Sequence, residues 1–159
     1  MKREQLLSIF LFLVANGSSA ITPITGFTDS NYSGQGEWLQ DDGSVGTFSA
    51  FLDLEPSSWT LARFEVANLF VYKTNVTIDS EGFLSAEMID ETDPLNPIYY
   101  PGYGNCGTNY CQTNVYLYNG NLWNGFFFHP DNTISFYGAI NFDDGSPNVQ
   151  WEGSLILLP

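Results

Sequence analysis

Hydrophobic and polar residues alternate along much of the chain, most clearly near its C-terminal end. Between residues 133 and 142, Ile134, Phe136, Ile140 and Phe142 fall on one face, while Thr, Ser, Tyr, Ala and Asn occupy the positions between. A period of two is typical of a β-strand with one buried face. Residues 147–158 and 44–55 repeat the pattern, so these three segments are predicted to be strands.

Turn-forming residues separate the alternating segments. Groups rich in Asp, Asn and Gly tolerate the positive φ angles of tight hairpins, and they occur at Asp41-Asp42-Gly43, Ser80-Glu81-Gly82, Asn119-Gly120, Pro130-Asp131-Asn132 and Asp143-Asp144-Gly145. The pattern predicts eight or nine strands, at about 33–40, 44–55, 59–67, 69–79, 83–90, 111–118, 121–129, 132–143 and 147–158.

Consecutive hairpins favour an all-β, antiparallel up-and-down meander. A meander of this many long strands removes its exposed edges by closing into a barrel. We therefore expect a closed barrel, with a two-sheet sandwich or jelly roll as the alternative. Residues 21–159 are predicted to form this one domain.

The first 20 residues have the plan of a secretory signal. Lys2 and Arg3 precede the apolar run 6–14, and Ser18-Ser19-Ala20 supplies small residues at a cleavage site. The run is shorter than the ~20 apolar residues that span a bilayer. We expect an exported protein, periplasmic or extracellular, with no membrane insertion after cleavage.

Charge narrows the possible partners. The chain has 18 acidic and four basic residues. Lys2, Arg3 and Glu4 lie in the signal, so cleavage leaves 17 acidic residues and two basic ones, Arg63 and Lys73. Nucleic-acid binding is not expected, because it needs clustered Lys and Arg. We expect a monomer that binds a small apolar ligand or an extracellular macromolecule.

Cys106 and Cys111 are the only cysteines. In an exported protein their default state is a disulfide, which would be worth about 2 kcal/mol for so short a loop. Two thiolates alone do not make a zinc site. No metal site or cofactor is predicted.

Residues 91–110 interrupt the strand pattern with three prolines and three glycines. We interpret them as a structureless loop, a type of segment that is often functional. Tyr99, Tyr100 and Tyr103 lie here among Gly and Asn, as in many binding loops. The loop is predicted to act as a lid, or else to cross the barrel end with its tyrosines packed on the rim.

Three other positions complete the predicted binding set. Arg63 could pair with a carboxylate ligand, or with one of the many acids of the chain. Trp123 supplies a large aromatic surface. Phe126-Phe127-Phe128 must place at least one ring outside the alternating core, so Phe127 either lines a patch for a partner or sugar or packs under the long loop.

Catalytic and calcium chemistry have weaker support. Glu37, Glu65, Glu87 and Glu152 lie in predicted strands and could supply paired carboxylates, or face solvent. The single His129 stands at a turn, so no Ser-His-Asp triad is predicted. The turns at 41–42, 79–81 and 143–144 are rich in oxygen ligands but lack EF-hand spacing. No catalytic residue is predicted.

Gly36-Glu37-Trp38, at the start of the first predicted strand, resembles the Gly-x-Trp of lipocalins and related calycins. The resemblance implies a lipocalin-like barrel in which Trp38 plugs one end. It implies no particular ligand.

Three functions remain open. The first is a small barrel that holds an apolar or amphipathic ligand inside, under the loop 91–110. The second is a surface interaction module, such as an inhibitor, an adhesin or a sugar-binding domain. The third is a hydrolase that uses a carboxylate pair.

Overall fold

The computed structural model describes residues 30–55, 58–66, 70–79 and 81–159. Residues 1–29 lie outside the described part, and with them the predicted signal. The described chain forms ten strands: β1 (Ser30–Gln40), β2 (Val45–Leu54), β3 (Ser58–Val66), β4 (Phe70–Ile78), β5 (Phe83–Asp90), β6 (Ile98–Cys106), β7 (Tyr110–Leu117), β8 (Gly120–Phe128), β9 (Thr133–Phe142) and β10 (Val149–Leu157). None of the described residues belongs to a helix long and apolar enough to cross a membrane.

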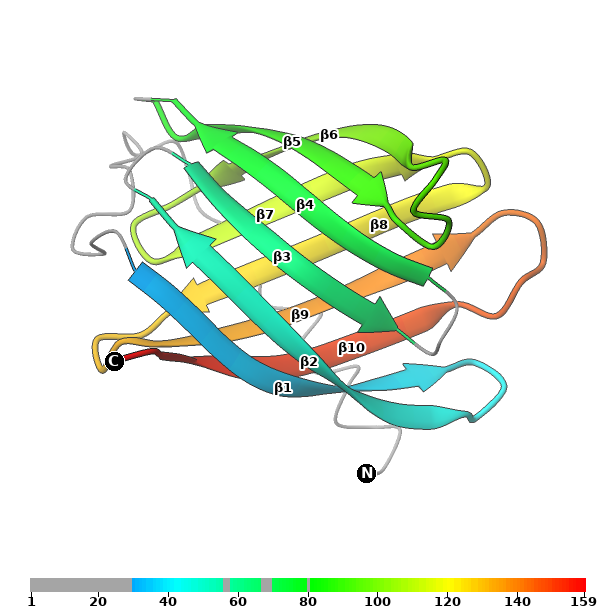
Figure 1. Ribbon diagram of the computed structural model, residues 1–159, viewed down its shortest axis with the longest axis horizontal. Helices are drawn as coiled ribbons and strands as arrows, with labels where there is room; N and C mark the ends of the chain where they lie inside the picture. The colour runs from blue at the N-terminus through cyan, green and yellow to red at the C-terminus, as the bar shows by residue number, and fades with distance from the viewer. Residues whose placement is uncertain (1–29, 56–57, 67–69, 80) are drawn as a thin grey trace.

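The strands form one antiparallel meander. Each strand pairs with the next one along the chain, and β10 also pairs with β1, so the order of hydrogen-bonded neighbours returns to its start. Figure 1 shows β3, β4 and β5 crossing in front of β7, β8 and β9. The predicted all-β antiparallel meander is confirmed, and the nine predicted segments correspond to β1–β5 and β7–β10.

The interpretation of residues 91–110 as one structureless loop is wrong. Only 91–97 connect strands, and β6 is a tenth strand that forms part of the wall. Pro101 fits there because pairing with β7 begins only at Gly102, which leaves Pro101 at an edge where its missing N–H is tolerated. Gly104 fits because a Cβ there would lie 1.8 Å from the carbonyl oxygen of Gln112. The close approach of β7 therefore requires glycine, which the pattern of alternation cannot reveal.

Alternate residues of the described strands point inward and form the core. Large apolar side chains dominate it, including Tyr32, Leu52, Tyr72, Met88, Leu122, Phe126, Ile134, Phe136, Trp151 and Leu155. The same alternation that predicts the strands therefore also predicts which face is buried.

The predicted disulfide is confirmed. Cys106 and Cys111 lie directly opposite each other on β6 and β7, and both are fully buried. The bond holds the β6–β7 hairpin together next to its turn.

The acidic turn residues have structural roles. Asp42, Asp79 and Asp144 each accept a hydrogen bond from the backbone N–H two residues ahead. This local bond stabilises the turn that leads to the next strand. Among the residues that the structure describes, no three His, Cys, Asp or Glu side chains gather as metal ligands.

Candidate functional site

Six residues are predicted to bind a ligand, and the five whose side chains the structure describes lie on different faces of the sheet. Tyr100 points inward and is buried, whereas Tyr99 and Tyr103 are exposed on the outer face of β6. Trp123 and Phe127 lie together on the outer face of β8. Arg63 lies in β3, and its side chain is outside the described part of the structure.

Inside the barrel, many of the described side chains are buried. A cavity wide enough for water would leave exposed area on the residues around it, yet Leu52, Leu122, Ile134, Ile140 and Leu155 are all fully covered. No water-sized cavity therefore adjoins these five side chains, whereas other inner residues keep some exposed area, such as 9% at Tyr100. The expected interior ligand stays a prediction.

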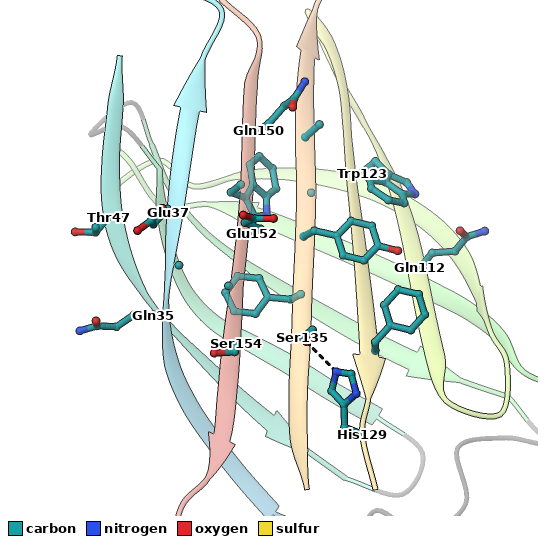
Figure 2. Close-up of a pocket in the computed structure, with 18 residues that line it drawn as sticks. Gln35, Glu37, Thr47, Gln112, Trp123, His129, Ser135, Gln150, Glu152 and Ser154 are labelled. Atoms are coloured by element: carbon teal, nitrogen blue, oxygen red, sulfur yellow. Dashed lines mark hydrogen bonds between the residues drawn. The ribbon is translucent and has the colours of Figure 1, made fainter. Parts of the chain in front are cut away.

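A groove of about 920 Å³ lies instead on the outer face (Figure 2). It crosses β1, β10, β9 and β8 and reaches Gln112 on β7. Figure 2 shows Trp123 and Gln112 on one side of it and Gln35, Glu37 and Thr47 on the other. Its volume is in the range of ~300–1,000 Å³ typical of ligand pockets. A second hollow of about 1360 Å³ lies along β1 and β2, where Ser and Thr side chains alternate with the larger apolar side chains of Val45, Phe51 and Ile156.

An aromatic cluster lies along one flank of the groove, and three of its four residues, Trp123, Phe127 and Tyr137, line the groove. The ring centroids of Trp123 and Tyr137 are 4.9 Å apart, those of Tyr137 and Phe127 are 5.7 Å apart, and those of Phe127 and Tyr110 are 6.2 Å apart. All four side chains point outward from β7, β8 and β9 and are only partly buried. The barrel core does not need these rings, so the sheet presents a continuous aromatic surface to its surroundings.

Gly125 sets the position of the central ring. It lies directly opposite Tyr137, and a Cβ on Gly125 would lie 2.7 Å from Cζ of the Tyr137 ring. Tyr137 therefore lies flat across β8, and this burial raises the pKa of its hydroxyl. The missing side chain at residue 125 is what lets the cluster pack against the sheet.

Carboxylates and amides form the other flank. Glu37 on β1 lies directly opposite Glu152 on β10, and Glu152 lies directly opposite Tyr137 on β9. Both glutamates are exposed, and two like charges in opposite positions weaken a sheet. The flank thus combines exposed hydrogen-bond acceptors with the amide side chains of Gln35 and Gln150.

His129 and Ser135 meet at one end of the groove. The Nε2 atom of His129 is 2.8 Å from the Ser135 hydroxyl, as the dashed line in Figure 2 marks. In the described residues the carboxylate of Asp131 accepts hydrogen bonds from the N–H and hydroxyl of Thr133. Among the residues that the structure describes, no hydrogen bond joins a carboxylate to the second ring nitrogen of His129, so they do not form a Ser-His-Asp triad.

The sequence pointed to two members of this cluster, Trp123 and Phe127, and placed Tyr110 in the tyrosine-rich segment 91–110, but it did not single out Tyr137 or Gly125. The available signal was the alternation in β9, because the rule that buries Ile134 and Phe136 places Tyr137 outside. Which outward residues become neighbours depends on strand register, and that information comes only from the structure.

No family model matches this chain, and no curated protein matches it. The Gly-x-Trp segment lies in β1, with Trp38 near the end of the strand and packed against the core. A Cβ on Gly46 of β2 would lie 2.5 Å from the Trp38 ring.

Proposed function

We propose that this protein is an exported binding module that holds a neutral carbohydrate in the outer groove. The observation that carries the proposal is the aromatic cluster of Tyr110, Phe127, Tyr137 and Trp123, which faces away from the core. Of the three functions open from the sequence, this is the surface interaction module, with a sugar as its ligand.

The chemistry of the groove supports a sugar. An aromatic face offers a flat apolar surface that matches the C–H face of a pyranose ring. Gln35, Gln150 and Glu152 lie beside it and can donate to or accept from ring hydroxyls. A mainly apolar pocket with a few polar groups that fix orientation is the usual design of small-molecule sites.

The charge of the protein supports a neutral ligand. Acidic residues outnumber basic ones by 18 to four, so an anionic polysaccharide would be repelled at a distance. Two carboxylates of the described residues line the groove, Glu37 and Glu152, and they add to this repulsion.

The proposed architecture is a lipocalin-like barrel that differs from calycins in where it binds. The position of Trp38 at one end of the barrel and the pairing of β1 with β10 support this part of the proposal. The buried disulfide is compatible with export.

The direct test is retention on insoluble neutral polysaccharides, with cellulose, chitin, xylan and β-1,3-glucan as the probes. Trp123→Ala and Tyr137→Ala should each weaken binding at least about tenfold, because aromatic residues at the centre of a site carry most of the affinity. Tyr99→Ala is the matched control, since Tyr99 is an exposed tyrosine away from the groove. Failure of the wild-type protein to bind every probe, or equal binding by Trp123→Ala, would overturn the proposal.

One observation supports the alternative function, a hydrolase that uses a carboxylate pair. Glu37 and Glu152 lie opposite each other in this groove. Incubation with the retained polysaccharide should release no reducing ends. If it does release them, and Glu152→Gln stops the release while binding persists, the protein is an enzyme and the binding-only proposal is wrong.

A further inference from the structure

A second aromatic surface lies beyond the groove, on β6 and β7. The rings of Tyr103 and Tyr116 have centroids 5.7 Å apart, and their hydroxyl oxygens are 2.6 Å apart. The two side chains are 58% and 52% exposed. The hydrogen bond holds the rings in place on the outer face, which lowers the entropy that a ligand would lose by ordering them.

The strand register places this pair in line with the groove. Trp123 on β8 lies directly opposite Asn114 on β7, and Asn114 lies directly opposite Tyr103 on β6. Neighbouring strands are about 4.8 Å apart, so the backbones at Trp123 and Tyr103 are separated by roughly 10 Å along a line that crosses the strands. On the other side, Ala139 of β9 and Gln150 of β10 continue the same row.

We propose that the ligand is an extended glycan chain that crosses the strands from β10 to β6, with one sugar on the Trp123–Tyr137 platform and a later one on the Tyr103–Tyr116 platform. This inference rests on the proposed function and specifies its ligand as an internal stretch of a polymer. A single sugar or a chain terminus would need only the groove.

The geometry between the two platforms favours a chain. Asn114 separates them, and its partly buried side chain carries an amide that can hydrogen-bond to the hydroxyls of an intervening sugar. The strand spacing is close to the length of one sugar in an extended chain, so successive rings meet successive strands. Each added ring that reaches a platform contributes stacking, and affinity should rise with chain length until both platforms are covered.

The experiment measures affinity against length by calorimetry, with oligosaccharides from disaccharide to hexasaccharide prepared from the polysaccharide that the wild-type protein retains. The double variant Tyr103→Ala/Tyr116→Ala should lose about tenfold in affinity for the hexasaccharide and bind the disaccharide unchanged. Trp123→Ala should weaken binding at every length. Tyr99→Ala, on the same strand and 55% exposed, should change neither.

Two further variants distinguish the loss of the rings from the loss of the hydrogen bond between the hydroxyls. Tyr103→Phe and Tyr116→Phe keep the rings and remove the hydrogen bond, so they should retain most of the affinity for long chains, and their circular dichroism checks the fold. If the alanine double variant binds all lengths as the wild type does, or loses affinity equally at all lengths, the proposal of a chain that reaches the Tyr103–Tyr116 platform is wrong. Binding of the disaccharide by the wild type would then still support the groove. If the wild type binds no glycan, the proposed function itself fails.

Discussion

The hairpins β4–β5 and β8–β9 differ on their outer faces, although the inner faces of both bury apolar side chains of the core. The hairpin β4–β5 buries Tyr72, Val76, Leu84 and Met88, and the hairpin β8–β9 buries Leu122, Phe126, Ile134 and Phe136. On the outside, β4 and β5 carry mainly polar residues, Lys73, Asn75, Thr77, Ser85 and Glu87, together with one exposed ring, Phe83, at the start of β5. The outside of β8 and β9 carries Trp123, Phe127 and Tyr137 instead.

This difference between the outer faces shows which side chains the fold requires. A barrel strand with a buried inner face is stable with a polar outer face, as β4 and β5 show. Aromatic rings on the outside of β8 and β9 cost solubility and supply little to the core. The proposed function gives these outer rings a role as a ligand-binding surface.

The largest expected effect is on the free energy of unfolding, and it distinguishes two adjacent residues on opposite faces of β8. Phe126 is 2% exposed and faces the core, whereas Phe127 faces the groove. Phe126→Ala should lower the free energy of unfolding by about 3–5 kcal/mol because it leaves a cavity. Phe127→Ala should lower it by only about 1 kcal/mol, the value of lost ring contacts. Urea unfolding followed by tryptophan fluorescence measures both, and equal losses would mean that the outer ring serves stability.

A smaller effect should follow from filling the space under Tyr137. Gly125→Val places methyl groups where the ring lies, and the ring can swing outward because only its far end is in the way. We expect a fold that persists, a changed ring-current shift of the residue 125 Hα in NMR spectra, and a roughly tenfold weaker affinity for the retained glycan. Thr77→Val, on the polar face, is the control and should change nothing. Unchanged glycan affinity in Gly125→Val would show that the flat ring is not part of the site.

The smallest effect concerns the turn between β9 and β10. Hydrogen bonds from Ser146 and from the Asn119 side chain lower the pKa of Asp144 to about 2, from an ordinary value of 3.8. A lowered pKa in the folded state means that the stabilisation is complete above pH 3.8 and is lost as the pH falls through about 2. Carbon NMR titration should find this midpoint, and Asn119→Ala should raise it. A midpoint near 3.8 in the wild type would show that these bonds do not form in solution.

Strand positions were predictable because alternation is a local property. In β9 and β10 the buried residues occupy every second position, and the turn residues mark the ends. β6 escaped prediction because Pro101, Gly102 and Gly104 are residues that usually end a strand. They are compatible with β6 only through its partial pairing with β7 and the close approach of the two backbones, and both are properties of the assembled sheet.

The site was predictable only in part, for the same reason. A run of three phenylalanines requires that at least one ring point outward, so Phe127 could be found in the sequence. The contact of Phe127 with Tyr137, and the row that links Trp123 to Tyr103, depend on the register between strands. Alternation fixes the face of each residue and leaves its neighbour across the strand undetermined.

Because β1 pairs with β10, the first strand to be synthesised lacks one of its partners until the tenth has been made. β1 is made first, yet one of its two partners is Val149–Leu157, near the end of the chain. Until those residues emerge, the unpaired edges of β1 and β9 are templates for association with other chains. Contacts so distant in sequence also form slowly. The nascent chain should therefore depend on chaperones until its last strand is made, and a truncation before residue 149 should aggregate although nine strands are complete.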